Sequence, residues 1–347
     1  MNLSLTLSFR PTEPSLFDRK SFSPIKYAQK QHVPIFHQPK LDPRRTQFSV
    51  TAKRPSPIEG LSEEMSVMAS QNLDHAPARR RVRSAFVDVH QQLDHCLFKM
   101  DHAGIRTEEW YGRNSKGMQI FCKSWLPKLD VQIKGALCFC HGYGSTCTFF
   151  FEGRPEVKGL PFFIMGESMG GAVTLKIHLK EPSKWDGVIL VAPMCKIAED
   201  VMPPAIVLKL LALMSEVLPQ AKLFPQKDMA GLSYRDPRKR KTAGYNVISY
   251  KDHMRSRTAV ELLKATSDIE TQLDKVSGPL LILHGAADKV TDPLVSQLLY
   301  EKASSKDKTL KLYQDGYHCI LQGEPDDRIF TVLDDIVTWL DFRCSPN

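Results

Sequence analysis

Short hydrophobic segments alternate with amphipathic segments along most of this chain. The hydrophobic segments have the length and the Val, Ile and Leu content of strands that are buried on both faces. They lie at residues 133–140, 161–165, 187–192, 279–284 and 309–313. Several of the intervening segments repeat apolar residues at helical spacing, most clearly at 329–340. This alternation predicts an α/β fold, with a mostly parallel sheet flanked by helices on both faces.

The chain before this region is more varied. Residues 78–100 carry apolar side chains at helical spacing and predict a helix that opens the main domain, which we expect to span 78–347. Residues 105–111 and 118–125 flank a turn and predict a hairpin. Residues 58–77 are polar and irregular, so they are expected to form a linker.

Residues 197–268, approximately, interrupt the alternation of strands and helices. This stretch contains Pro203-Pro204, a nearly all-apolar helical segment at 205–214 and a basic tract at 238–241. An insertion of this size between two core strands predicts a helical cap over the site. Its apolar excess has two interpretations that stay open: ordinary packing, or a lipophilic surface that binds an acyl chain or makes peripheral contact with a membrane.

The charge of the chain is unevenly distributed. The net charge is +8 over 347 residues, but residues 1–57 alone contain ten basic and three acidic side chains. The remainder is close to neutral, so no nucleic-acid partner is expected. The hydrophobic fraction of the whole chain, 42%, is sufficient for the core of one large domain.

The first 57 residues resemble a targeting segment in composition. They are rich in Ser, Thr and Pro, poor in acidic residues, and lack the continuous apolar stretch of a secretory signal. We therefore expect an organellar transit peptide that is disordered, with Val50-Thr51-Ala52 as a processing site. The alternative is a disordered basic tail without a targeting role.

The cysteine pattern points away from disulfides and metals. The chain has eight cysteines and no C-x-x-C pair, and Cys138-Phe-Cys140-His141 has the wrong spacing for a zinc site. These residues are expected to be reduced thiols, most of them buried. We expect no metal, no organic cofactor and no membrane-spanning segment.

The pentapeptide Gly166-Glu167-Ser168-Met169-Gly170 is the most informative motif of the chain. It follows the apolar segment 161–165 and precedes a helical segment, 171–178. A G-x-S-x-G sequence between a strand and a helix is typical of the nucleophile elbow of serine hydrolases. The turn is so tight that it leaves no room for a side chain at Gly166 or Gly170. Ser168 is the expected nucleophile.

A serine nucleophile needs a general base and a group that orients this base. Asp288 and His318 each follow a predicted strand, in the order Ser, acid, His that α/β-hydrolases use. Asp292 is the alternative acid, but Asp292-Pro293 begins a predicted helix and is better explained as its N-cap. For His284, at a strand end, packing or hydrogen bonding is a sufficient explanation.

Acyl transfer also requires donors for the oxyanion. The backbone N–H of Met169, directly after the nucleophile, is one expected donor. The second donor is expected in His141-Gly142-Tyr143-Gly144, where glycines let the backbone approach a substrate carbonyl. Within this loop, we expect the backbone N–H of Tyr143 to be the donor.

Several motifs together resemble the plant monoacylglycerol lipase-like family, which includes caffeoylshikimate esterases and lysophospholipases and carries a serine aminopeptidase S33-type hydrolase domain. The resemblance extends from about Arg79 to Arg343 and rests on residues 141–151, 166–171, 190–195, 283–292 and 316–318. It implies a serine hydrolase with the triad Ser168, Asp288 and His318 that cleaves a monoacylglycerol, a lysophospholipid or a phenylpropanoid ester. The N-terminal extension is similar to that of plastid members of the family, which implies localisation in the chloroplast. The alternative is localisation in the cytoplasm, with peripheral attachment to membranes.

One departure from this family is large. Only 26 residues separate His141 from Ser168, where family members place a helix, a central strand and a second helix. A single parallel crossover needs a dozen or more residues, so a direct link between the flanking strands is possible. With the join near Gly153-Arg154, the hairpin is expected to lose the strand that ties it to the sheet. The alternative to an active enzyme is therefore a catalytically inactive form or a ligand-binding remnant.

Overall fold

The computed structural model describes residues 105–114, 116–145, 159–196, 205–222, 229–244, 249–250 and 253–344, together with Glu63, Val67 and Val82. Apart from these three residues, the expected transit peptide, the linker and the N-terminal helix lie outside the described residues, and so does the expected join near 153–154.

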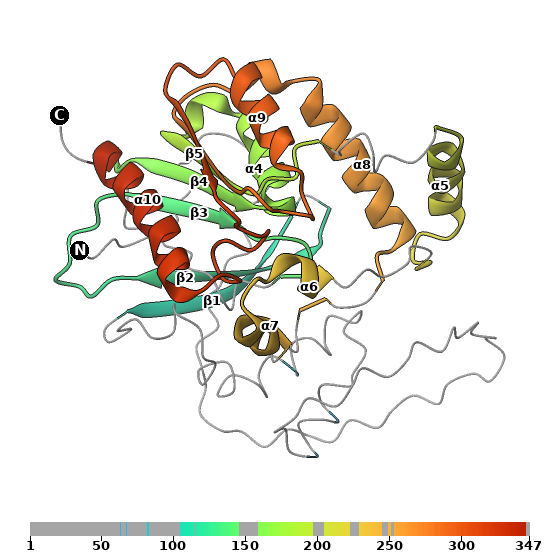
Figure 1. Cartoon of the computed structure of the whole chain (residues 1–347), viewed down its shortest axis with the longest axis horizontal. Helices are drawn as coiled ribbons and strands as arrows, with labels where there is room; N and C mark the ends of the chain where they lie inside the picture. The colour runs from blue at the N-terminus through green and yellow to red at the C-terminus, as the bar shows by residue number, and fades with distance from the viewer. Residues whose placement is uncertain are drawn as a thin grey trace.

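A parallel sheet of five strands forms the centre of the described structure (Figure 1). All four pairings in the sheet are parallel, and the strands follow each other in sequence order from edge to edge. The α/β fold expected from the hydrophobic pattern is confirmed. The strands are β3 (Ala136–Cys140), β4 (Phe162–Glu167), β5 (Gly187–Val191), β6 (Leu280–Gly285) and β7 (Lys308–Tyr313).

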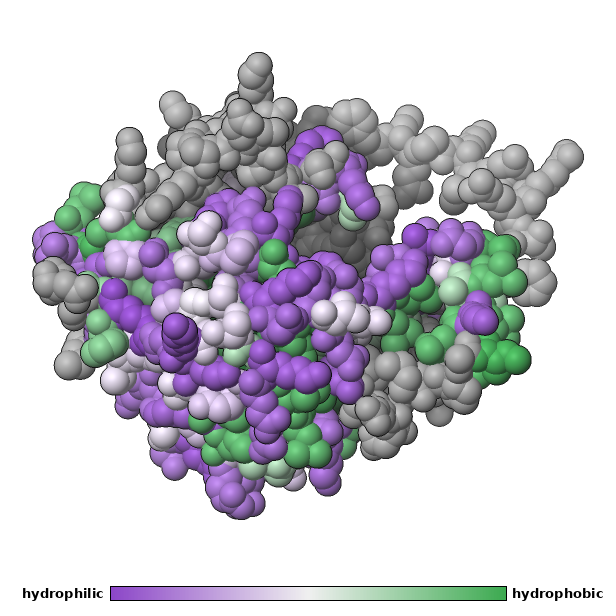
Figure 2. Space-filling model, turned by 90° about the horizontal axis from the view of Figure 1, so that it is seen from above, coloured by the Kyte–Doolittle hydropathy of each residue, from purple (hydrophilic) through white to green (hydrophobic). Residues whose placement is uncertain are grey.

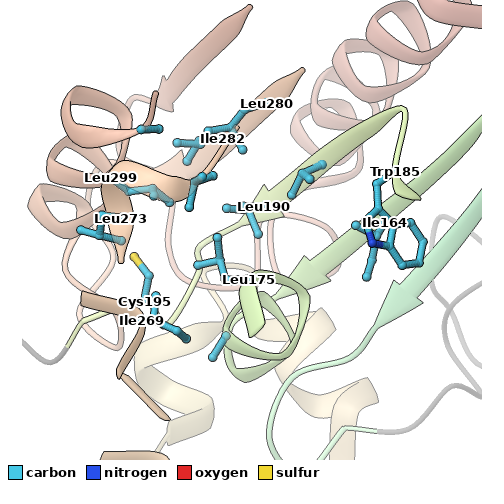
Figure 3. Close-up of a cluster of buried hydrophobic side chains, with 14 of the residues drawn as sticks. Ile164, Leu175, Trp185, Leu190, Cys195, Ile269, Leu273, Leu280, Ile282 and Leu299 are labelled. Atoms are coloured by element: carbon cyan, nitrogen blue, oxygen red, sulfur yellow. The ribbon is translucent and has the colours of Figure 1, made fainter. Parts of the chain in front are cut away.

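Helices cover both faces of this sheet, because successive side chains of the buried strands point to opposite faces. Ile164, Leu190 and Ile282 pack in one hydrophobic cluster with side chains of the helices on that face (Figure 3). Their neighbours along the strands pack in a second cluster against the C-terminal helix. The first face carries α4 (Met169–Lys180), α8 (Ser256–Glu270) and α9 (Pro293–Lys302), with the short 3₁₀ turns Pro182–Lys184 and Leu273–Lys275, and the second carries α10 (Asp326–Cys344).

The hairpin is separate from the sheet. β1 (Arg106–Arg113) pairs with β2 (Gln119–Leu126) in an antiparallel ladder that forms its own two-stranded sheet. Among the described residues, β4 is the only strand that pairs with β3. The arrangement agrees with the expectation from the short His141–Ser168 spacing, since no described strand joins the hairpin to β3.

The insertion between β5 and β6 contains α5 (Ala205–Val217), α6 (Met229–Ser233) and α7 (Pro237–Gly244). The end of the α5 segment contacts the start of α8, where the Ser256 N–H donates to Ala221 O (2.8 Å) and Arg257 pairs with Glu216 (2.5 Å). Farther along α8, Ile269 is fully buried in the main core. The range 197–268 expected for the cap therefore ends inside a helix that continues into the core.

The α6–α7 segment is attached to the loops at the C-terminal end of the sheet. Ser233 O accepts from the Cys319 N–H (3.1 Å), and the Asp236 N–H donates to Gly323 O (2.9 Å). The Arg235 guanidinium donates to Asp315 O (3.0 Å), and Lys239, which is 3% exposed, pairs with Asp326. This part of the insertion therefore fixes the position of the loop that carries His318.

Candidate active site

Ser168 lies at a sharp turn between β4 and α4. Its backbone has φ 56° and ψ −120°, a strained conformation for a residue with a side chain. Two hydrogen bonds hold the turn against the next strand: the Ser168 N–H donates to Val191 O (3.0 Å) and the Met194 N–H donates to Ser168 O (2.9 Å). This strand–turn–helix geometry is the one expected for the motif.

The glycines of the motif permit very close backbone packing. A Cβ atom on Gly170 would lie 1.8 Å from Cys140 O, and one on Gly166 would lie 2.2 Å from Gly170 O. Any larger side chain at either position would displace the turn. These contacts explain why a glycine stands on each side of Ser168.

Asp288 and His318 are in direct contact. His318 Nδ1 lies 2.6 Å from Asp288 Oδ2, and both side chains are buried. The loops that carry them are tied together by the Ala287 N–H, which donates to Gly316 O (2.9 Å). Burial of Asp288 opposes its ionisation, but hydrogen bonds from His284 and His318 outweigh this effect and hold the pKa of the carboxyl well below its usual range.

The alternative acid, Asp292, has a different role. Its carboxylate accepts a hydrogen bond from the Leu294 N–H (2.9 Å), and Pro293 is the first residue of α9. Asp292 is therefore the N-cap of this helix, as its sequence context indicates.

No hydrogen bond joins the Ser168 hydroxyl to another described side chain. The serine and the Asp288–His318 pair are linked through the backbone instead: Ser168 bonds to Val191, and Thr291 Oγ1 lies 3.1 Å from both Ala192 O and His318 Nδ1. All of these groups thus meet at one end of the sheet. Hydrogen bonds between nucleophile and base often tighten only in the complex with substrate.

The loop 141–144, which is expected to bind the oxyanion, lies beside Ser168. A Cβ atom on Gly142 would be 3.4 Å from Ser168 Cβ, and His141 Nδ1 lies 2.9 Å from Gly142 O. Gly144 has φ +74°, and its carbonyl accepts from the Tyr250 N–H (2.9 Å). Tyr143 contacts Tyr250 edge to face at 5.9 Å between ring centroids.

Met169 is the first residue of α4, so its N–H has no partner within the helix. This N–H is therefore available to a ligand at the turn.

From the sequence, we assigned no part in this site to three of its residues, although we considered His284 and explained it by packing or hydrogen bonding. His284 and Thr291 both contact the Asp288 carboxylate, at 3.0 Å and 2.9 Å from Oδ2. Glu167, inside the G-x-S-x-G motif, is 2% exposed, and its Oε1 has no hydrogen-bond partner among the described residues. The spacing His-Gly-Ala-Ala-Asp at a strand end was the available signal for His284; nothing in the sequence alone indicated that the Glu167 side chain points inward.

Glu167 belongs to a buried polar cluster behind the serine. Burial raises the pKa of its carboxyl to about 7, with His318 opposing the shift and Asp288 adding to it. Burial also raises the pKa values of Tyr234 and Cys319, which both interact with Glu167. A neutral Glu167 at the lower end of the physiological pH range avoids a second carboxylate charge beside Asp288.

The described residues offer neither a metal site nor a membrane-spanning helix. Among the described side chains, no group of three or more His, Cys, Asp or Glu is placed to hold a metal ion. Within the same residues, no helix has the length and apolar character to cross a membrane.

A parallel sheet with a serine at a strand–helix turn, followed in sequence by an aspartate–histidine pair at the same end, defines the α/β-hydrolase class. Within this class, the chain belongs to the serine aminopeptidase S33 family, whose model matches residues 148–326. Together with the relatives below, this membership makes the chain a serine hydrolase of the carboxylic ester hydrolase type.

Similar proteins of known activity include a caffeoylshikimate esterase from Arabidopsis thaliana, 34% identical over 69% of this chain and 86% of that protein. A monoglyceride lipase from Homo sapiens is 32% identical over 73% of this chain and 75% of that protein. The alignment with the Arabidopsis protein is 288 residues long. This is longer than the part of this chain that it covers, which is 69% of 347 residues. It therefore includes positions of the relative that have no counterpart here.

Solved structures support the same fold. A monoglyceride lipase variant from Saccharomyces cerevisiae in complex with a substrate analog superposes with a TM-score of 0.54 at 18% identity, over 71% of this chain and 95% of that one. A carboxyl esterase from Bacillus coagulans gives 0.55 at 15% identity, over 69% of this chain and 99% of that one.

We expect Glu167 to make the folded protein less stable as the pH rises. Its pKa is raised from 4.5 to about 7, so its contribution to stability is full below pH 4.5 and is lost as the pH rises through 7. Glu167→Gln is neutral at every pH. Between pH 4.5 and 8, wild type should lose on the order of 3 kcal/mol relative to this variant in urea unfolding.

The exposed Glu301 provides the control, since Glu301→Gln should leave the pH dependence of wild type unchanged. If the free energies of unfolding of wild type and Glu167→Gln changed equally with pH, the pKa of this carboxyl would not be raised.

Proposed function

We propose that this chain hydrolyses carboxylic esters through Ser168, His318 and Asp288. The 2.6 Å contact between His318 Nδ1 and Asp288 Oδ2 is the observation that carries the proposal. An ionised Asp288 accepts from Nδ1–H, which leaves the other ring nitrogen, Nε2, as the basic site. A base of this tautomer can take the proton of the Ser168 hydroxyl as the oxygen attacks the ester carbonyl.

The remaining steps use the groups around the turn. The backbone N–H groups of Met169 and Tyr143 stabilise the oxyanion, each by about 3–4 kcal/mol. His318 then returns the proton to the leaving alcohol, and water releases the acyl group by the same route in reverse. The nucleophile, the base, the acid and the oxyanion donors all belong to the chain itself.

Replacing the nucleophile tests this proposal directly. Ser168→Ala should lower the hydrolysis of a short-chain nitrophenyl ester by at least about 10³-fold, because no other group at the turn can form the acyl-enzyme. The control is Ser183→Ala, an exposed serine after α4, which should retain wild-type activity. Wild-type rates for Ser168→Ala would contradict the assignment, and an inactive wild type would favour the catalytically inactive alternative.

We propose a monoacylglycerol or a lysophospholipid as the substrate. The monoglyceride lipases among the relatives support a lipid ester, and so does the surface of α5. The second candidate is a caffeoylshikimate-type phenylpropanoid ester, which the 34% identity to the Arabidopsis esterase favours.

Side-by-side kinetics distinguish the two substrate classes. We expect kcat/KM for a long-chain monoacylglycerol to exceed that for caffeoylshikimate by at least about tenfold. Burial of a few methylene groups of the acyl chain provides enough binding free energy for a difference of this size. The reverse ranking would assign the chain to the phenylpropanoid esterases.

We propose that α5 makes peripheral contact with a lipid surface. Four apolar side chains at helical spacing are exposed on it: Ile206 (78%), Leu210 (57%), Leu213 (64%) and Val217 (72%). Figure 2 shows the resulting hydrophobic area over this helix. A continuous apolar stripe on an exposed helix is typical of interfacial binding.

Serine substitutions in this stripe should release the protein from membranes. We expect wild type to float with phosphatidylcholine vesicles and a variant with serine at these four positions to remain unbound, with unchanged hydrolysis of a soluble ester. Leu129→Ser/Leu294→Ser, at exposed apolar positions outside α5, is the control. Equal flotation of wild type and the α5 variant would assign membrane contact elsewhere.

We also propose localisation in the chloroplast, on the composition of residues 1–57. A fluorescent fusion that carries these residues should enter plastids, and retention in the cytoplasm would favour the alternative location.

A further inference from the structure

A second imidazole contacts the carboxylate oxygen that His318 contacts. His284 lies in β6 and is fully buried. Its Nε2 is 3.0 Å from Asp288 Oδ2 and 3.1 Å from Thr291 O. Its Nδ1 is 2.7 Å from the hydroxyl oxygen of Ser296, on α9. His284 thus bridges a core helix and the carboxylate at the site.

The partners of His284 define its tautomer. An ionised carboxylate and a backbone carbonyl both accept hydrogen bonds, so Nε2 carries the proton. The Ser296 hydroxyl then donates to Nδ1. The neutral ring satisfies both of its nitrogens in this form, as a fully buried imidazole requires.

The Asp288 carboxylate is held on both oxygens. The backbone N–H groups of Val290 (2.7 Å) and Thr291 (3.1 Å) donate to Oδ1. These two bonds hold one oxygen of the carboxylate. His284 contacts the other oxygen, Oδ2, and the Thr291 hydroxyl donates to the same atom while also facing Ala192 O. His284 and His318 thus contact the same carboxylate oxygen, and the bond from His284 helps to hold this oxygen where it meets His318.

We propose that His284 is a positioning residue for the ester hydrolysis described above: it holds Asp288 Oδ2 in the direction of His318 Nδ1. The inference rests on the proposed function, since it assigns His284 a part in the same reaction. His284 does not touch the substrate; it acts through Asp288 alone.

Two variants of His284 separate its polar role from its volume. His284→Leu removes both hydrogen bonds, while His284→Gln retains a donor for Asp288 and an acceptor for Ser296. We expect His284→Leu to lower kcat for a soluble nitrophenyl ester by about 10- to 100-fold with little change in KM, the size of effect seen when a residue that orients a functional group is removed. His284→Gln should recover most of this loss.

A double-mutant cycle with Asp288→Asn tests whether His284 acts through Asp288. In the Asp288→Asn background, His284→Leu should cause no further loss of kcat, because the oxygen it positions no longer orients His318 as a carboxylate. Losses that multiply would indicate a general structural role and overturn the proposal, as would wild-type kcat in His284→Leu.

Ser296→Ala is a milder variant in case His284→Leu does not fold. It removes the donor to Nδ1 and should lower kcat by a smaller factor, again with no effect in the Asp288→Asn background. Thermal unfolding of each variant confirms that folded protein is compared. Unchanged kcat in folded Ser296→Ala, together with an inactive but folded His284→Gln, would also overturn the proposal.

The same data distinguish this inference from the proposed function. Should Asp288→Asn retain wild-type kcat, the proposed triad itself is wrong. If Asp288→Asn loses about 10³- to 10⁴-fold, as expected for a residue that fixes the tautomer of the base, and His284→Leu loses nothing, only the inference about His284 fails.

Discussion

An ionised carboxylate buried at the end of a sheet needs hydrogen-bond donors, because an unpaired buried charge costs several kcal/mol. Asp288 meets this requirement with donors from β6, from its own loop and from the loop after β7. They are the backbone N–H groups of Val290 and Thr291, the Thr291 hydroxyl and the imidazoles of His284 and His318. The orientation of His318 therefore depends on satisfying this one charge. The ends of three parallel strands, β5, β6 and β7, supply the scaffold for it.

The second constraint is the close backbone packing around Ser168. β3 pairs directly with β4, and Gly170 lies against Cys140 at the end of β3. The site thus uses only the five contiguous strands, whereas the β1–β2 hairpin forms a separate sheet. The separate hairpin does not alter the strands that carry the serine, the aspartate and the histidine. The five strands consequently bring the Ser168 turn and the Asp288–His318 pair to one end of the sheet.

Much of this arrangement could be predicted from the sequence, because buried parallel strands have a clear hydrophobic signature. The five strands, the hairpin and the N-cap role of Asp292 were all predictable from local patterns. The inward direction of Glu167 and the bond from His284 to Asp288 were not. Both depend on the turn of the chain after a strand and on neighbours from distant segments, such as Ser296 and Tyr234. The His-Gly-Ala-Ala-Asp spacing places His284 near Asp288 in the sequence, but a local pattern does not show which way a side chain points or which distant segment it meets.

The central claim is that His318, oriented by Asp288, activates Ser168. Peptide mapping by mass spectrometry after brief reaction with a fluorophosphonate tests it most directly, since only an activated serine reacts fast. The account predicts a single adduct on Ser168, formed at a rate that falls by at least about 10³-fold in His318→Ala. An adduct on a different residue, or equal labelling of Ser168 in His318→Ala, would contradict it.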